Sequence, residues 1–475
     1  MAASADRLND KTPSLPSARS RGDWVFFCFL LLLLFVIYNS NFRVIPSTDT
    51  IPARVLPFGL LLDHTLYLDR WIRRDSPSPP YYTAKSHGHL MSRYPIMTAV
   101  AVTPLYVLPA LWLSRQSPPL YPLSHVFFLL VDTMEKLSAS LIAALSGAVL
   151  FLALRRIASR SVSVVVALIY GLASNTWAIS SQALWRQGLA ELCFAFLLWV
   201  LFRLPDLPSA PFWVGLALAV ATANRPEEGI LIVPFLLYFG RRHWKKTPLF
   251  LAPLGALGLL VFAYNRYFFG TVLGVYVTGQ VRGQIPGTGS GAYIALLASL
   301  PVGILGSLVS PSRGLLVYTP WTAFAFWGAA RVWKGKSPDW SRPLLVTLAT
   351  IGVAQLLGAP WWGGWGFGPR YSTDLLPFLA WFLVPVWPSI RARTALRLVF
   401  GAAVAIALWV EVVGAFYYPE GQWDGWPVSV DLAPQRCWDW SDNQVLRSWK
   451  AGPASPFLLN DWEGFLKARS TMPQP

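Results

Sequence analysis

The chain has 475 residues, of which 54% are hydrophobic and only 13% are charged. A soluble domain is about one quarter charged, so this chain has too little polar surface for a water-soluble globule, and lipid must cover much of it. Its formal charge of +16 does not indicate a nucleic-acid partner, because many lysines and arginines stand in short turns between apolar runs and no RNA- or DNA-binding motif occurs.

The first predicted element is a membrane span over residues 24–39. The polar stretch before it, residues 1–23, carries the basic residues Arg7, Lys11, Arg19 and Arg21. This arrangement resembles a signal peptide, but no small-residue cleavage site follows the apolar run. We therefore expect an uncleaved first span whose N-terminal tail lies in the cytoplasm.

Further apolar runs follow along the chain, at 95–113, 119–131, 137–154, 162–179, 188–202, 209–224, 229–240, 248–264, 292–310, 314–330, 342–359, 374–388 and 398–416. A straight span needs about 20 apolar residues, so several runs are short for a single crossing. Between them stand basic turns at Arg155-Arg156, Arg203, 241–246, 331–336 and 391–397. The bias of positive charge toward cytoplasmic loops predicts that all these turns lie on one side.

That condition restricts which runs cross the membrane. The two runs within 95–131 must both cross or both stay outside, and broken interfacial helices are favoured by Pro104, Pro109, Pro118, Pro119 and Pro122. The run 292–310 must also stay outside, as a helix on the outer face, or the turn 331–336 would be extracytoplasmic. We therefore predict an all-α polytopic membrane protein with about eleven spans and interfacial helices in a first outer loop, 40–136.

The predicted transmembrane domain covers 24–416, and residues 417–475 form an extracytoplasmic C-terminal segment. This segment is hydrophilic and rich in tryptophan, with Trp423, Trp426, Trp438, Trp440, Trp449 and Trp462. Such tryptophans form either a belt at the lipid headgroups or the core of a small packed cap over the outer face.

Asp49 is the candidate catalytic residue. It stands just after the first predicted span, in Ser47-Thr48-Asp49-Thr50-Ile51-Pro52. Ser, Thr and Asp ahead of Ile-Pro are typical of a helix N-cap. The alternative is a carboxylate that deprotonates or orients an acceptor hydroxyl or amine.

Further along the same loop, His87-Gly88-His89 looks like part of a metal site, but no third ligand is near and a turn is favoured. The three cysteines show no CxxC or Cys/His zinc spacing and no disulfide pattern. No cofactor is therefore predicted, and a divalent metal stays an open alternative that these patterns do not support. Arg93 and Tyr94 follow, where the chain returns to the membrane surface; Arg93 would contact lipid headgroups or a substrate phosphate.

Four more arginines fall in predicted outer loops, where the positive-inside bias disfavours them: Arg186, Arg225, Arg313 and Arg370. Several guanidinium groups on one face suit a phosphate, which they grip bidentately. Each arginine has the alternative of an ordinary salt bridge, for example Arg225 with Glu227 or Glu228. Arg370 ends a stretch of glycines and tryptophans, 361–370, whose flat rings suit sugars, a lipid groove or an interfacial belt.

These motifs resemble the GT-C superfamily of integral-membrane glycosyltransferases, in the branch of protein O-mannosyltransferases and the lipid A aminoarabinose transferase. The resemblance covers most of the chain in architecture and is sharpest at Asp49…Arg54, Arg93-Tyr94-Pro95, Trp185-Arg186-Gln187-Gly188, Asn224-Arg225-Pro226-Glu227, Ser310-Pro311-Ser312-Arg313-Gly314 and Gly368-Pro369-Arg370. Two departures stand out: Thr50 follows Asp49 where some relatives have an Asp-Glu pair, and Gln187 replaces a second acidic residue that would support a metal site.

The resemblance implies a role for each matched residue. Asp49 would act at the acceptor as base or orienter, and Arg93 would contact the phosphate of a lipid-linked donor. Arg313 and Arg370 would help to neutralise that phosphate. The remaining matched positions, expected to contribute to substrate binding, are Arg54, Tyr94, Arg186, Arg225 and Glu227.

The predicted function is transfer of a sugar from a polyprenyl-phosphate donor to a glycan, lipid or protein acceptor at the outer face of a bacterial inner membrane. Three alternatives stay open. A transporter or flippase would show repeated halves and charged residues at mid-bilayer, whereas the unusual residues here cluster at outer ends. A polysaccharide polymerase or ligase would use a diphosphate donor. A non-enzymatic scaffold would have lost activity.

Overall fold

The computed structural model of the chain describes residues 21–72, 78–116, 124–284, 290–335, 337–358 and 360–470. Most of the predicted tail, 1–23, and part of the run 119–131 lie outside these residues. The described chain is mostly helical, with one two-stranded antiparallel sheet. The all-α prediction is therefore confirmed.

The longer helices that build the bundle are α1 (Arg21–Asn39), α5 (His125–Leu154), α6 (Arg160–Leu172), α7 (Arg186–Leu201), α8 (Ala210–Asn224), α9 (Ile232–Arg242), α10 (Thr247–Phe269), α12 (Ser290–Val309), α14 (Thr322–Lys334), α15 (Ser341–Gly358) and α18 (Thr394–Phe416). Shorter elements connect or cap them: α2 (Ile51–Phe58), β1 (Thr83–Ser86), β2 (His89–Ser92), α3 (Met97–Val102), α4 (Val107–Ser114), α11 (Gly274–Gln284), α13 (Leu315–Tyr318), α16 (Leu376–Phe382), α17 (Trp387–Ala392), α19 (Gln444–Ala451) and α20 (Phe457–Ser470).

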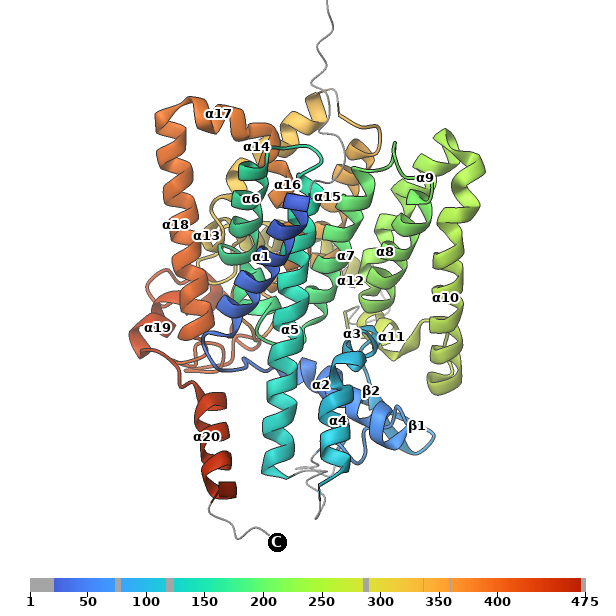
Figure 1. Cartoon of the computed structure of the whole chain (residues 1–475), viewed down its shortest axis with the longest axis vertical. Helices are drawn as coiled ribbons and strands as arrows, with labels where there is room; N and C mark the ends of the chain where they lie inside the picture. Colours follow the sequence, from blue (N-terminus) through green and yellow to red (C-terminus); the bar gives the residue numbers. More distant parts are fainter. Residues whose placement is uncertain are drawn as a thin grey trace, which may run out of the picture.

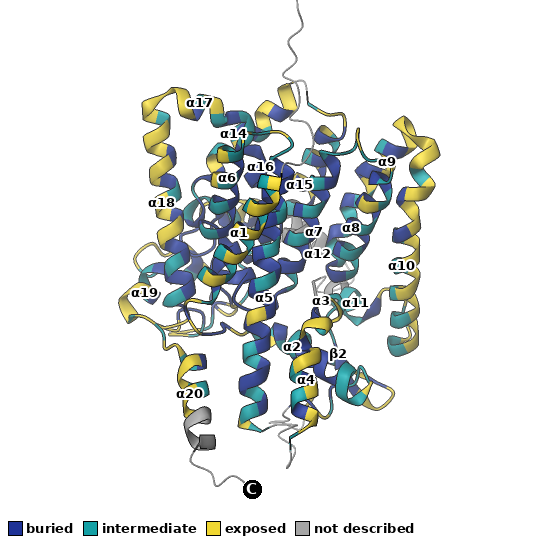
Figure 2. Ribbon diagram, viewed as in Figure 1, coloured by how far each residue is buried: buried dark blue, intermediate teal, exposed yellow. Residues whose placement is uncertain are grey.

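Helix α5 lies at the centre of the bundle and packs against α1, α6 and α7 (Figure 1). Small residues let α1 approach closely: a Cβ at Gly147 of α5 would stand 2.6 Å from Leu34, and one at Gly171 of α6 would stand 2.8 Å from it. Without side chains there, the helices pack through backbone and van der Waals contact, which is how helices associate in lipid. Figure 2 shows the consequence, with buried residues along α5 and α7 and exposed residues along α10 and α18.

Two ends of the bundle differ in character. We call one the basic end, because it carries the turns at Arg155-Arg156, 241–246 and 391–397, drawn at the top of Figure 1. Asp23 at the start of α1 pairs there with Arg155 at 3.0 Å and with Arg160 at 3.1 Å. The opposite end, which we call the loop end, carries α2, α4, both strands, α19 and α20 (Figure 1). The predicted separation of basic turns from long loops is thus visible in the fold.

Six helical stretches among the described residues are long and apolar enough to cross a membrane: Arg21–Asn39, Met97–Ser114, His125–Leu154, Trp244–Phe269, Arg370–Ala392 and Thr394–Phe416. Shorter apolar helices cover Arg160–Leu172, Ala210–Asn224 and Ser299–Val309. The chain is a multi-pass membrane protein, as predicted. The count of about eleven spans stays a prediction, since several predicted spans are divided between short helices.

The first predicted outer loop forms a compact layer at the loop end. Helices α2, α3 and α4 pack together, and their apolar residues form one cluster with Trp71 and with the first turns of α5. Met97–Ser114 has the composition of a span, yet it is divided into α3, a 3-10 turn and α4, and α4 lies beside the outermost part of α5 (Figure 1). This broken course is the one that its prolines predict.

Candidate active site

Asp49 lies in a single 3-10 turn, Thr48–Thr50, immediately before α2. The capping function belongs to Ser47, whose Oγ accepts a hydrogen bond of 3.2 Å from the Asp49 backbone N–H. Pro52 then occupies the first turn of α2, where it needs no hydrogen-bond partner. The cap therefore leaves the Asp49 carboxylate available for other contacts.

That carboxylate gathers three side chains from distant parts of the chain. Asp49 Oδ1 accepts hydrogen bonds from the hydroxyl groups of Tyr94, at 2.7 Å, and Tyr81, at 2.9 Å. Asp49 Oδ2 pairs with Arg370 Nη1 at 3.2 Å. The side chain keeps 29% of its surface exposed, so a ligand can still reach it.

These contacts decide the ionisation of Asp49. Burial acts to raise the pKa of the carboxyl group, but Arg370 and the hydrogen bonds from Tyr94 and Tyr81 outweigh burial, so the pKa lies below its ordinary value. Burial and the Asp49 charge raise the pKa of Tyr81 to about 12 and also raise that of Tyr94. At neutral pH the site therefore holds one carboxylate and two protonated phenols.

A β-hairpin places the two phenols side by side. Strands β1 and β2 pair with Thr83 opposite Ser92. Tyr81 stands two residues before Thr83 and Tyr94 two residues after Ser92, so both lie beyond the same end of the hairpin. The tight turn between the strands is made by His87 and Gly88, with φ of 50° and 84°, as a type I′ hairpin turn requires. The histidines of His87-Gly88-His89 thus serve the turn, in agreement with the turn interpretation.

Arg370 follows a loop rich in glycine, residues 360–368, which we call the glycine loop, and its side chain contacts Asp49. Gly363, Gly364 and Gly368 of this loop have positive φ of 76°, 65° and 61°, which only glycine adopts readily. The Arg370 guanidinium lies over the ring of Trp185 at 4.4 Å and also donates to the Gly363 carbonyl. Stacking on one side and the loop on the other hold the guanidinium against Asp49.

Two further arginines stand around Tyr94. Arg186 lies over the rings of Tyr276 and Tyr94, at 4.4 Å and 5.2 Å, and its Nη2 donates to the Tyr276 hydroxyl at 2.9 Å. Arg186 Nη1 is buried and has no hydrogen-bond partner among the described residues. Arg93 Nη1 donates to the Tyr81 carbonyl at 3.3 Å, and no carboxylate of the described residues pairs with it. Both groups have unused donors.

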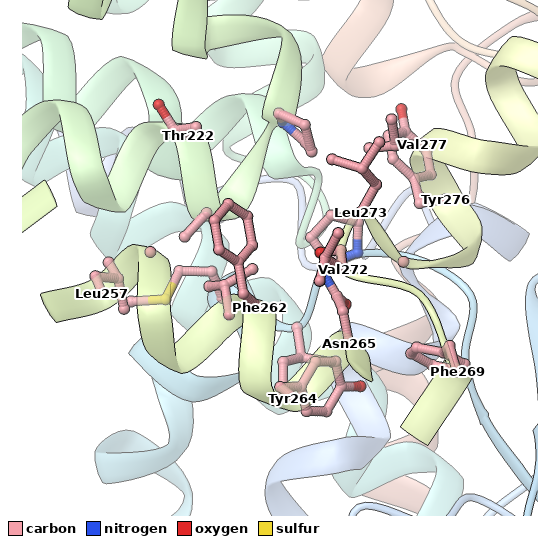
Figure 3. Close-up of a pocket in the computed structure, with 18 of the residues that line it drawn as sticks. Thr222, Leu257, Phe262, Tyr264, Asn265, Phe269, Val272, Leu273, Tyr276 and Val277 are labelled. Carbon is pink, nitrogen blue, oxygen red and sulfur yellow. The ribbon is translucent and has the colours of Figure 1, made fainter. Parts of the chain in front are cut away.

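An apolar cavity of about 590 Å³ adjoins these residues, between α8, α10 and α11 (Figure 3). Its lining is almost wholly apolar, including Leu257, Phe262 and Leu273. Arg93, Tyr94 and Tyr276 also line it. Tyr94 therefore joins the cavity to Asp49, because the same side chain lines one and donates to the other.

Arg225 forms salt bridges within the chain, which was the alternative to a substrate contact. Its Nη2 lies 3.0 Å from both Glu227 Oε1 and Asp374 Oδ2, and the residue is 2% exposed. The neighbouring Asn224, part of the matched motif but not a predicted site residue, joins two elements: its Nδ2 donates to the Arg186 carbonyl at 2.6 Å and its Oδ1 accepts from Thr98 at 2.7 Å. Asn224, next to the buried Arg225 ion pairs, thus supports the position of Arg186.

Arg313 and Arg54 have other partners than the expected substrate. All five N–H groups of Arg313 are used within the chain, by the carbonyls of Ser312, Trp362 and Gly364 and the side chains of Gln444 and Asp424. Arg54 pairs with Glu135 at 3.2 Å and with Asp132 at 2.5 Å, on the first turns of α5. Arg313 thus uses all its donors within the chain, whereas Arg54 Nη1 is shared by two carboxylates and its Nε has no partner among the described residues. The substrate-binding role expected of both stays a prediction.

Four contributors to this region were absent from the predicted site: Tyr81, Tyr276, Gln444 and Asp374. Single tyrosine and glutamine residues carry no spacing signal, and Asp374 stands four residues after Arg370, at the start of the apolar run 374–388. Among the described residues no group of three or more His, Cys, Asp or Glu side chains is arranged to hold a metal ion.

Comparison with known proteins adds little. No protein-family model matches the chain, and no curated protein sequence matches it. Among solved structures it is similar to an oligosaccharyltransferase from Archaeoglobus fulgidus, tethered to an acceptor peptide, with 10% sequence identity and a TM-score of 0.44. The alignment covers 87% of this chain and 59% of that structure, so this chain matches well under two thirds of it. A TM-score of 0.44 is too low to carry a conclusion about activity.

Proposed function

We propose that this protein is a membrane glycosyltransferase of the GT-C kind, which transfers a sugar from a polyprenyl-phosphate donor to an acceptor. The observation that carries the proposal is the position of Tyr94, which lines the apolar cavity beside Arg93 and donates to Asp49. A polyprenyl chain suits such a cavity, and its phosphate suits guanidinium groups with unused donors.

In this reaction the bond between the anomeric carbon and the phosphate oxygen breaks, and its electron pair leaves on the phosphate. The acceptor hydroxyl forms the new bond to the anomeric carbon, and its proton passes to Asp49. Arg93 and Arg186 would stabilise the charge that grows on the phosphate, because they are already positioned before the charge develops.

Asp49 would act mainly as an orienting carboxylate that accepts the proton late. Its lowered pKa makes it a weak base in the ground state, so it cannot deprotonate an alcohol early. Arg370 would hold Asp49 in place and keep it ionised. Arg313 and Arg54 have no part in this proposal, since Arg313 uses all its donors within the chain and Arg54 pairs with Asp132 and Glu135.

The orientation follows from charge. The basic end carries the turns rich in arginine and lysine, so we propose that it faces the cytoplasm, together with the N-terminal tail. The loop end and the C-terminal segment would then face the outside of a bacterial inner membrane. A donor on the outer leaflet would enter the cavity between α8 and α10 from the lipid.

Reconstitution tests the proposal. Proteoliposomes would receive radiolabelled polyprenyl-phosphate hexoses or pentoses, with total membrane glycans, lipids and peptides as acceptors. Transfer of label from a monophosphate donor is expected. Transfer only from a polyprenyl-diphosphate donor would favour a polymerase or ligase, and flux of solute without transfer would favour a transporter.

A further inference from the structure

A surface beside Asp49 has no part in the donor chemistry. The glycine loop 360–368 is clasped by the C-terminal segment: the indole N–H of Trp362 donates to Asp431 at 2.9 Å, and that of Trp365 donates to Ser429 at 3.2 Å. Deeper in, Gln444 donates to the Gly366 carbonyl and accepts from the Gly368 N–H, both at 2.9 Å. The loop and the segment therefore form one rigid unit.

Two large aromatic side chains of this unit are exposed at its surface. Trp365 is 54% exposed and Trp426 is 66% exposed. A Cβ on Gly425 would stand 3.0 Å from the Trp365 ring, so the Trp365 ring lies against the residue that precedes Trp426. Among the described residues neither ring has an aromatic partner. We call Trp365, Trp426 and Asp431 the aromatic shelf.

The shelf adjoins the site through Gly364. A Cβ at Gly364 would lie 3.8 Å from Arg370 Nη2 and 3.9 Å from Asp431 Oδ1. Arg370 in turn pairs with Asp49. The shelf thus begins one glycine away from Arg370, which pairs with the carboxylate that we propose receives the acceptor proton. It lies on a different element from the apolar cavity.

An interfacial belt does not account for these rings. Trp449 shows what a belt residue of the same segment does: its ring packs against Trp409 of the last span, α18, at 5.9 Å. In contrast, the indole N–H of Trp365 is bonded within the chain, to Ser429, and the exposed Asp431 lies near Gly364, the residue before Trp365. A fixed flat ring next to a carboxylate suits a sugar, whose C–H face stacks on the ring while its hydroxyls donate to the oxygen.

We propose that the aromatic shelf binds the acceptor and that the acceptor is a saccharide, stacked on Trp365 and Trp426 and bonded to Asp431. The proposal rests on the proposed glycosyltransferase function and specifies its acceptor class. It assigns the acceptor to the C-terminal segment and the glycine loop, and the donor to the cavity between α8 and α10.

The test measures saccharide binding without any donor. The full chain in nanodiscs would be titrated calorimetrically with maltohexaose, cellohexaose and mannohexaose, and separately with a serine- and threonine-rich peptide. At least one hexasaccharide should bind the wild type. Trp365→Ala and Trp426→Ala should each weaken that binding about tenfold, and Trp365→Phe should retain most of it because the flat face remains.

Trp440 provides the matched control, since it lies in the same segment and is 63% exposed, and its ring has no hydrogen bond or ring contact with the described glycine loop. Trp440→Ala should leave hexasaccharide binding unchanged. Absence of binding by all three hexasaccharides, an equal loss in Trp440→Ala, or binding of the peptide in their place would overturn the proposal.

A parallel arm separates this proposal from the proposed function. Release of labelled sugar from polyprenyl-phosphate mannose is measured in the same nanodiscs. Hexasaccharide binding that depends on Trp365, without any use of the donor, would keep the shelf and reject the transferase. Transfer from the donor to a peptide, insensitive to Trp365→Ala, would keep the transferase and reject the shelf.

Discussion

Arg313 and Arg370 both stand near glycines at the loop end, and each pairs with an aspartate. They differ in how many of their N–H groups are bonded within the chain. Arg313 is 2% exposed and spends all five of its N–H groups on the chain, including Asp424 at 2.7 Å. Arg370 bonds Asp49 and Gly363, and its Nε has no partner among the described residues. A saturated arginine organises the fold, and one with donors to spare beside an open carboxylate is available to a ligand.

The two regions are nevertheless joined. Gln444 accepts from Arg313 and from the Gly368 N–H, so the hub around Arg313 supports the loop that carries Arg370. The comparison therefore separates a framework from a working site. Variants at the hub should change stability first, and variants at the Asp49 cluster should change chemistry first.

The largest effect is expected at Asp49. Asp49→Asn should lower the transfer rate by about 10²–10⁴-fold, because the amide cannot accept the acceptor proton. The rate would be measured with a polyprenyl-phosphate sugar in proteoliposomes, with thermal unfolding as a check on folding. Asp63→Asn is the control, since Asp63 of the same loop pairs with the half-exposed Arg70. Wild-type transfer by Asp49→Asn would reject the assignment.

Arg313→Ala should lower the free energy of unfolding by about 3–5 kcal/mol, because it leaves the Asp424 carboxylate buried without its cation. Denaturant titration in detergent micelles measures this change. Arg242→Ala removes an ion pair whose two side chains are 65% and 62% exposed and should cost less than about 1 kcal/mol. Equal losses in the two variants would contradict a framework role for Arg313.

Arg93→Ala should raise the KM for the donor about tenfold while changing kcat less, because a phosphate contact is made in both ground and transition states. Arg93→Lys should recover part of the affinity, since the charge remains but the bidentate geometry is lost. Arg115→Ala, an exposed arginine of the same loop, is the control. A fall in kcat alone would place Arg93 outside donor binding.

The smallest effect concerns pH. Asp49 must be ionised, so activity is present above its pKa and is lost as pH falls through it. Because the folded pKa is lowered, the acid limb of the rate profile should lie below the ordinary value of about 3.9. Tyr81→Phe removes one hydrogen bond and should move this limb upward by less than about one pH unit. Tyr67→Phe, with no contact to Asp49, should leave it in place.

The same carboxylate affects stability with the same sign. A lowered folded pKa means that ionised Asp49 stabilises the fold above the unfolded pKa, and that this contribution is lost as pH falls toward the folded value. Tyr81→Phe should therefore reduce stability slightly at neutral pH and hardly at all in strong acid.

Sequence reasoning succeeded where the signal was local. Apolar runs predicted the helices, prolines predicted the broken course of Met97–Ser114, and His87-Gly88 predicted a turn. Asp49, Arg93, Tyr94, Arg186 and Arg370 were named as site residues from motifs, and the structure places them around the Asp49 carboxylate and the adjoining cavity. Arg54, Arg225 and Arg313 were named with the same reasoning and pair with carboxylates other than Asp49.

What the sequence by itself determined is the membrane-embedded helical class and the asymmetry between a basic end and a loop end, because burial and charge act through composition and short-range periodicity. What only the tertiary structure decided is which carboxylate each arginine pairs with and which arginines keep N–H groups without a partner. The local sequence around an arginine in an outer loop does not reveal its partner, which is Asp424, 111 residues away, for Arg313 and Asp49, 321 residues away, for Arg370. Those partners are set by packing across the bundle, and no local spacing records them.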